Sequence, residues 1–352
     1  MKVSVVIPLY NDENNIFLVL DAFLRQTMRP YEIIVVDNGS KDRSKEVVRS
    51  FIASNKEAPV VLDDEREKGA ASARNRGITL ASGDIIAFLD SDCIPEKDWV
   101  ESIVGFFLEH PEYDAVGGSH LSYPSKNILE NFMNLYWFLD TTLFPEMELR
   151  DKKEVFECKL LSTYNSAFRT ASVKKIGLFD TSFKTAAGED VDYVLRALQA
   201  NVRMYLFFKK MIVYHNFKKM DFFSILRKQK EYTRTWTILL KNYMRRSFCV
   251  CLFNRMLWNK KFPLFIYVTH YTCYVTAMLL LLIVKGGWAV IILFHVLEMM
   301  KEVITARLRL KKKKCTAGYG QAITIYVLWF VRRLWTIMLR IFYSFKCRIY
   351  YL

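Results

Sequence analysis

The strongest constraint on the fold is the alternation of strand-like and helix-like segments over residues 1–120. The segments 3–9, 32–36, 60–62 and 85–89 are largely apolar, and the segments near 16–24, 41–54 and 70–81 have helical character. Strands that are apolar on both faces and joined by helices are typical of a parallel sheet with both faces covered. We therefore predict an α/β fold with a mostly parallel sheet flanked by helices.

The charge of the chain divides it into two parts. Residues 1–215 contain 26 Lys+Arg and 32 Asp+Glu, a net charge of −6, whereas residues 216–352 contain 25 and 4, a net charge of +21. The basic part also contains the long apolar runs, a combination that favours a membrane surface over nucleic acid. We therefore expect a membrane partner and no nucleic acid.

The apolar runs of the second part predict a membrane-bound region. Residues 262–284 carry no formal charge over 23 positions, which is long enough to span a bilayer, and 288–297 could form the return arm. Basic residues precede and follow this pair, so both ends should face the cytoplasm. A water-soluble helical domain is the alternative.

The resulting organisation has four parts. We expect a catalytic domain at 1–215, basic amphipathic juxtamembrane helices at 216–261, a transmembrane hairpin at 262–300, and a basic interfacial or third membrane helix at 301–352. The catalytic domain would lie at the cytoplasmic face of the cell membrane.

Three carboxylates follow predicted strands, at Asp37, Asp90 and Asp92. In sheets of this type, ligands bind beyond the carboxyl ends of the strands. Asp90 and Asp92 would point to one side of an extended chain, and their repulsion would be relieved by a divalent cation such as Mg²⁺ or Mn²⁺. The alternative is that all three are ordinary turn or helix-cap residues.

The segment 68–77 combines small residues at a helix start with cations one turn later, including Arg74. Such a segment suits phosphate, although a surface helix with arginine would look similar. His215 follows the apolar run 211–214, where a lone histidine is usually structural. Trp99 and the run 136–138 could stack on a sugar ring, but core packing is the stronger expectation.

The order of the segments VSVVIPLYND, VVDNGSKD, ARNRG, ASGDIIAFLDSD and GED resembles glycosyltransferase family 2, the inverting transferases of GT-A fold. The resemblance implies a nucleotide-diphosphate sugar donor. It places Asp92 on the metal, gives His215 a metal or diphosphate contact, and makes Asp190 the general base. The residues that it implies along the nucleotide are Pro8, Tyr10, Asp37, Arg74 and Asp90.

The chain departs from the family pattern at two positions: Cys93 stands where many members have a third acid, and Lys68 where many have Asn. Processive members carry QxxRW, whereas here Gln229 and Trp236 have the wrong spacing. We therefore expect transfer of a single sugar to a lipid-linked or saccharide acceptor in cell-surface glycan synthesis. The alternatives are a nucleotidyltransferase, a processive polysaccharide synthase and an inactive membrane scaffold.

Overall fold

The computed structural model describes residues 1–122, 155–157, 161–207 and 210–216, and isolated positions between 223 and 256. The chain divides into two units, Met1–Tyr123 with Asp151–Asn216, and Pro124–Arg150 with Phe217–Leu352. Where it is described, the second unit contains the antiparallel strands β12 (Cys251–Leu252) and β13 (Arg255–Met256). The predicted segments 262–300 and 301–352, most of 216–261, and the aromatic run 136–138 lie outside the described residues.

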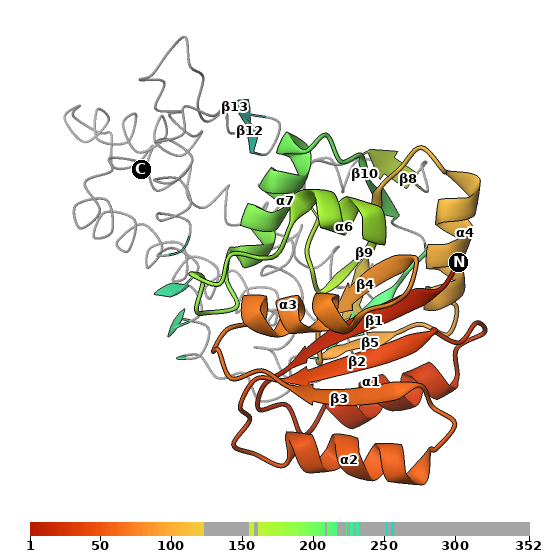
Figure 1. Cartoon of the computed structure of the whole chain (residues 1–352), viewed down its shortest axis with the longest axis vertical. Coiled ribbons are helices and arrows are strands. Elements are labelled where there is room, and N and C mark those ends of the chain that lie inside the picture. Colours follow the sequence, from red (N-terminus) through yellow and green to blue (C-terminus); the bar gives the residue numbers. More distant parts are fainter. Residues whose placement is uncertain are drawn as a thin grey trace, which may run out of the picture. The chain divides into compact units, whose positions relative to one another are not determined.

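The first unit contains an eight-stranded sheet (Figure 1). Its strands are β1 (Val3–Leu9), β2 (Glu32–Asp37), β3 (Val60–Asp64), β4 (Ile85–Leu89), β6 (Ala115–Gly118), β8 (Val155–Glu157), β9 (Asn165–Arg169) and β10 (Met204–Phe207). Their spatial order is β3-β2-β1-β4-β9-β6-β10-β8. The block β3-β2-β1-β4 is entirely parallel, and β10 is parallel to β6, while β9 runs antiparallel to both of its neighbours. The predicted mixed α/β fold with a mostly parallel sheet is confirmed.

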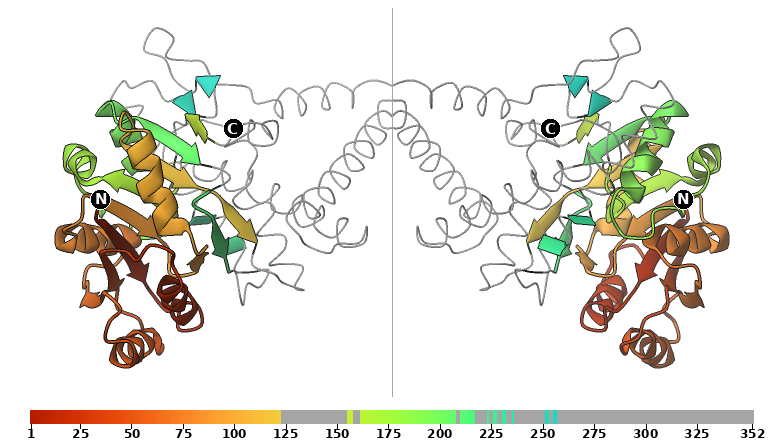
Figure 2. Two further views of the ribbon diagram at one scale, coloured as in Figure 1. Left: turned by 90° about the vertical axis from the view of Figure 1, so that its right-hand side faces the viewer. Right: turned by 90° about the vertical axis from the view of Figure 1, so that its left-hand side faces the viewer.

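Helices cover both faces of this sheet (Figure 1). They are α1 (Ile16–Leu24), α2 (Ser44–Ser54), α3 (Ala70–Leu80), α4 (Trp99–Glu109), α6 (Thr170–Ile176) and α7 (Glu189–Gln199). Figure 2 shows the same elements from two opposite sides. Helices α1 and α2 lie on one face of the parallel block, and α3 lies on the other.

Alternation along the strands explains this arrangement. Val5 and Ile7 of β1 belong to the main core, which also contains the apolar faces of α1, α2 and α4. Val6 points to the opposite face, toward α3, because successive side chains of a strand point to opposite sides. A Cβ atom on Gly77 of α3 would lie 2.2 Å from Cγ1 of Val6. The glycine therefore allows α3 to approach β1 closely.

A second, three-stranded sheet lies at the carboxyl end of β4. It consists of β5 (Cys93–Pro95), β11 (Val213–His215) and β7 (His120–Ser122), with β11 in the middle. Strands β5 and β11 are antiparallel, and their register places Cys93 opposite His215. This pairing brings the residue after Asp92 beside a histidine that is more than a hundred positions away in the sequence.

Candidate active site

Asp37 ends β2 with one carboxylate oxygen engaged and one available. Its Oδ2 atom accepts hydrogen bonds from the backbone N–H groups of Gly39 and Ser40, both at 3.2 Å. Its Oδ1 atom is buried and has no hydrogen-bond partner. Because buried polar atoms are nearly always paired, this oxygen is a candidate acceptor for a ligand group.

Arg74 joins the end of β4 to the start of α7. Its guanidinium donates from Nη2 to Oδ1 of Asp90 and from Nη1 to Oε1 of Glu189, both at 2.8 Å. The arginine is 2% exposed and Glu189 is 3% exposed. Burial opposes the charge of Arg74, but the two carboxylates outweigh it and raise the pKa of the arginine. The sequence predicted that Arg74 would line the nucleotide, yet two of its nitrogens are bound within the protein.

Glu189 is a buried carboxyl group with a raised pKa. Burial raises its pKa to about 7, against the opposing charge of Arg74. Its Oε2 atom is buried without a hydrogen-bond partner, because Arg74 reaches only Oε1. Burial therefore favours the protonated form of Glu189 more than it would be favoured in an exposed glutamate.

Asp190 stands in the first turn of α7, after Gly188, which adopts φ 87°. Its Oδ1 atom accepts a 2.8 Å hydrogen bond from the N–H of Val191. Burial raises the pKa of Asp190, the charge of Arg74 opposes the rise, and Asp90 adds to it. A carboxylate with a raised pKa is better suited to removing a proton from a hydroxyl group than an ordinary aspartate.

An aromatic cluster packs α7 against the sheet beside β4. The ring of Tyr193 in α7 stacks on Phe179 at a centroid distance of 3.9 Å and packs edge-on against Phe88 of β4. Asn75 of α3 makes two hydrogen bonds with the backbone of Phe179. Its Nδ2 atom donates to the carbonyl at 2.9 Å, and its Oδ1 atom accepts from the N–H at 2.8 Å. Adjacent residues of α3, Arg74 and Asn75, thus connect to α7 and to the loop that precedes it.

The Asp90–Asp92 segment differs from the predicted extended geometry. Ser91 and Asp92 form a turn, closed by a 3.0 Å hydrogen bond from the N–H of Cys93 to the carbonyl of Asp90. The expectation that both carboxylates share one side of an extended chain is therefore wrong. Asp90 binds Arg74, while Asp92 lies 3.5 Å from Nε2 of His215, measured from its Oδ1 atom.

Asp92, Cys93 and His215 form the one group of possible metal-binding side chains found among the described residues, with ligand atoms within 4.8 Å of one another. The 3.5 Å separation of Asp92 and His215 is longer than a normal hydrogen bond. Burial, with the charges of Asp92 and Asp90, raises the pKa of the Cys93 thiol, which lies 3.7 Å from Oδ1 of Asp92 as a hydrogen-bond donor. These three residues could hold a cation, with Cys93 the least suited to a hard ion.

Asp12 is a candidate site residue that was not among those predicted from the sequence. Helix α1 begins at Ile16, so Asp12 lies in the loop before it. Its Oδ2 atom accepts a 2.6 Å hydrogen bond from Ser91, and burial together with the charge of Asp92 raises its pKa to about 6. The signal that could have found it is an acidic residue directly after a predicted strand end.

The remaining predicted residues are placed as follows. Pro8 is half-buried near the end of β1, beyond the last β1–β4 pair, and Tyr10 is 55% exposed just after the strand. Asn38, which was not among the predicted site residues, connects the loop after β2 to the loop before α3. It accepts from the N–H of Gly69 and donates to the carbonyls of residues 65 and 67. Trp99 is fully buried and donates a 2.8 Å hydrogen bond to Asn165, which confirms its role in the core.

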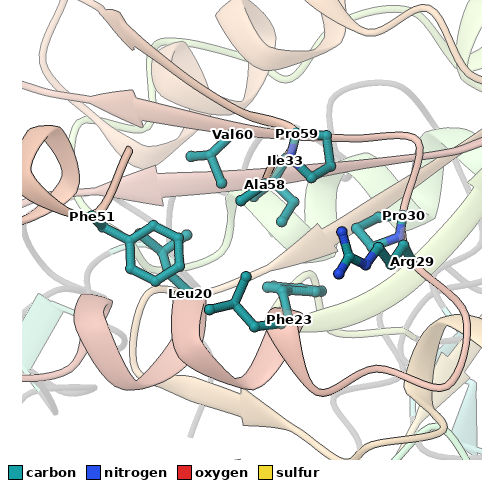
Figure 3. Close-up of a pocket in the computed structure, with 10 residues that line it drawn as sticks. Leu20, Phe23, Arg29, Pro30, Ile33, Phe51, Ala58, Pro59 and Val60 are labelled. Carbon is teal, nitrogen blue, oxygen red and sulfur yellow. The ribbon is translucent and has the colours of Figure 1, made fainter. Parts of the chain in front are cut away.

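A surface pocket elsewhere in this unit is apolar (Figure 3). It is lined by residues of α1, α2, β2 and β3 and the neighbouring loops, and Arg29 is the charged residue in its lining. None of the predicted site residues lines it. This pocket therefore does not include the carboxylates at the strand ends or at the start of α7.

The chain is similar in sequence to known glycosyltransferases. Residues 4–177 match the family model described as Glycosyl transferase family 2. The glycosyltransferase AglE of Haloferax volcanii is 34% identical over 201 residues, covering 56% of this chain and 62% of AglE. The glucosyl-dolichyl phosphate glucuronosyltransferase of the same organism is 31% identical over 121 residues, covering 34% of this chain and 38% of that protein. The chain thus spans less than two thirds of either relative.

A solved structure supports the same fold class. The mannosyltransferase PcManGT from Pyrobaculum calidifontis, in complex with GDP-Man and Mn²⁺, superposes with a TM-score of 0.60 at 17% identity, covering 96% of this chain and 87% of that one. The architecture is therefore GT-A-like. In the part of the chain that the structure describes, no helix combines the length and apolar character that crossing a membrane requires.

Proposed function

We propose that this chain is an inverting glycosyltransferase that moves a single sugar from a nucleoside-diphosphate sugar to an acceptor hydroxyl group. The observation that carries the proposal is the joining of the strand ends to α7 by Arg74, which binds Asp90 and Glu189 at 2.8 Å each. This bridge fixes the start of α7, and with it Asp190, to the end of β4. Sheets of this type bind ligands beyond their strand ends, and Asp190 has a raised pKa, which supports its role as the base.

In this reaction Asp190 removes the proton from the acceptor hydroxyl as the oxygen attacks the anomeric carbon of the donor sugar. The bond between that carbon and the diphosphate oxygen breaks, and the nucleoside diphosphate leaves from the opposite face. One base is sufficient for such a displacement, which inverts the configuration at the anomeric carbon. The free oxygen of Asp37 suits a hydrogen-bond donor on the base or ribose of the nucleotide.

We also propose that Asp92 and His215 hold a divalent cation, which would neutralise charge on the departing diphosphate when bound. Their facing atoms are 3.5 Å apart, too far for a strong hydrogen bond but suitable for two groups that share an ion. A carboxylate paired with an imidazole favours Mn²⁺ over Mg²⁺, because Mg²⁺ prefers ligand sets made of oxygen alone. The relative solved with GDP-Man and Mn²⁺ is consistent with this choice.

For the acceptor we propose a lipid-linked sugar presented at the cytoplasmic face of the cell membrane. The net charge of +21 over residues 216–352 and the uncharged run 262–284 support membrane attachment of the second unit. The name of the H. volcanii glucuronosyltransferase, which refers to a glucosyl-dolichyl phosphate, supports an acceptor of this type. Carbonate extraction of membranes tests the attachment, because complete release of the chain would contradict spanning helices.

The deciding experiment is a panel of UDP-, GDP- and TDP-sugars, tested with and without Mn²⁺ for protection against thermal unfolding. We expect one base class to raise the melting temperature, and to do so more strongly with Mn²⁺, because a ligand that binds only the folded state stabilises it. Incubating that donor with lipid-linked acceptors should then release a nucleoside diphosphate. Release of pyrophosphate would instead identify a nucleotidyltransferase. If the Asp92→Ala and Asp190→Ala variants complement a strain lacking this protein as well as the wild type does, the chain is an inactive scaffold.

A further inference from the structure

A closed ring of hydrogen bonds surrounds the turn that carries Asp92. Ser91 donates from Oγ to Oδ2 of Asp12 at 2.6 Å, and Asn15 donates from Nδ2 to Oδ1 of Asp12 at 2.7 Å. Asn216 donates from Nδ2 to Oδ1 of Asn15 at 2.9 Å, and its backbone N–H donates to the carbonyl of Asp92 at 2.9 Å. The peptide bond between Ser91 and Asp92 completes the ring.

The ring joins segments that are far apart in the sequence. Asp12 and Asn15 precede α1, Ser91 and Asp92 belong to the turn after β4, and Asn216 follows β11. Asn15 and Asn216 are buried, and the hydrogen bond between their side chains is also buried. A buried side-chain network of this kind fixes one geometry, because each member must keep its partner.

The position of the ring connects it to both proposed cation ligands. Asn216 directly follows His215 in the chain and donates its N–H to the backbone carbonyl of Asp92, so one residue fixes the backbone at both positions. Asp12 is itself anchored, since its N–H donates a 2.7 Å hydrogen bond to Oγ of Ser44 in α2. The turn is therefore tied to the helices that pack on the sheet.

We propose that Asp12, Asn15 and Asn216 are positioning residues that hold the carboxylate of Asp92 toward His215 and thereby set the affinity of the cation site. We call these three residues the brace. The proposal rests on the proposed function, because it needs a cation between Asp92 and His215. It goes beyond that function by assigning tasks to three side chains that do not themselves bind the cation.

Exchanging the side chains at positions 12 and 15 distinguishes an effect of side-chain position on cation binding from an effect of added charge. Asn15→Asp sets two carboxylates against each other and breaks the ring, although it adds negative charge close to the cation site. The double variant Asp12→Asn with Asn15→Asp closes the ring again, because the amide at position 12 then donates to the carboxylate at position 15. Asn216 can still donate to that carboxylate.

The measurement is the affinity for Mn²⁺, followed by the EPR signal of the free ion, in the presence of UDP or GDP. We expect Asn15→Asp to weaken Mn²⁺ binding by roughly tenfold, the lower end of the loss caused by removing a hydrogen-bond partner of a metal ligand, because Asn15 acts on Asp92 through Asp12 and Asn216. The double variant should restore binding to within about threefold of the wild type. Ser91→Ala, a smaller change, should weaken binding in the same direction if Asn15→Asp does not fold.

Control variants and melting curves complete the test. Asn55→Ala removes a similar side-chain hydrogen bond, from Asn55 to the carbonyl of Phe51 at the end of α2, and should leave Mn²⁺ binding unchanged. Unchanged or tighter Mn²⁺ binding by Asn15→Asp would overturn the brace, as would a double variant that fails to recover. A wild-type chain that binds no Mn²⁺ with either nucleotide would overturn the proposed cation site itself, and the brace with it.

Discussion

Arg74 donates a 2.8 Å hydrogen bond to Asp90 from a position that is 2% exposed, so this arginine is part of the frame of the site. Its second nitrogen holds Glu189 at the same distance. A guanidinium can serve two carboxylates at once because its donors form a rigid planar fork, which an ammonium group lacks. The bridge therefore fixes the distance between the end of β4 and the start of α7.

Arg74→Lys should destabilise the protein strongly. The lysine can satisfy only one of the two carboxylates well, and leaving a buried charge uncompensated costs roughly 3 kcal/mol. Arg76→Lys is the matched control in the same helix, because Arg76 pairs with Asp63 at a partly exposed position and such pairs contribute about 0–1 kcal/mol. Urea unfolding of both variants gives the comparison. Equal losses of unfolding free energy in Arg74→Lys and Arg76→Lys would contradict the structural role of the Arg74 bridge.

The stability of the fold should depend on pH through Glu189. Its folded pKa is about 7, raised by burial above the usual value of 4.5, so the folded state binds a proton more tightly than the unfolded state. The free energy of unfolding contributed by this group is therefore greatest below about pH 4.5 and falls as the pH rises through 7. Glu189→Gln removes the titration.

Melting temperatures of the wild type and of Glu189→Gln, measured from pH 4.5 to 8, test this expectation. The difference between them should change in favour of the variant as the pH rises, because glutamine stays neutral and still accepts from Arg74. Parallel curves over the whole range would show that Glu189 does not titrate there.

The local sequence predicted the elements better than their contacts. The apolar runs 3–9 and 85–89 indicated buried strands, because a strand covered on both faces needs apolar residues at every position. The burial of Arg74 could not be predicted locally, since Glu189 lies 115 positions further along the chain. The antiparallel insertion of β9 between β4 and β6 has the same origin, because pairing between distant segments leaves no periodic signal.

The geometry around Asp92 shows a second kind of limit. A spacing of two residues predicts a shared side only if the chain is extended, whereas Ser91 and Asp92 form a turn. Asp12 was missed because an acidic residue before a helix has a sufficient local explanation as a cap. Only the tertiary structure shows that it accepts a hydrogen bond from Ser91.

Gly77→Ala should destabilise the fold through packing alone. The added Cβ atom would lie 2.2 Å from Cγ1 of Val6, so α3 or β1 must move. Overpacking of this kind costs roughly 1–3 kcal/mol. Gly105→Ala in α4 is the control, because a Cβ atom added there would have no neighbouring atom within 4 Å, and alanine favours the helix. Thermal unfolding should show a loss for the first variant and none for the second.

Asp190→Asn should remove catalysis and spare donor binding. The amide can still accept the hydrogen bond from Val191, but it cannot take a proton from an acceptor hydroxyl. Loss of a general base lowers kcat by roughly 100- to 10,000-fold. Asp192→Asn is the control in the same helix turn, since Asp192 pairs with Arg196. For both variants we would measure sugar transfer and the protection that the donor gives against thermal unfolding. Loss of both properties in Asp190→Asn would instead indicate that Asp190 binds the donor.

His215 and Cys93 should differ in their importance for the cation, although both lie near Asp92. Imidazole is a good ligand for Mn²⁺, whereas a buried thiol with a raised pKa stays protonated and donates to Asp92. We therefore expect His215→Ala to weaken Mn²⁺ binding by at least roughly tenfold, and Cys93→Ser to change it by less than about threefold. Titration of Mn²⁺ in the presence of the preferred nucleotide measures both effects. A large loss in Cys93→Ser, with wild-type melting behaviour, would make the sulfur a ligand and would point to a softer ion such as Zn²⁺.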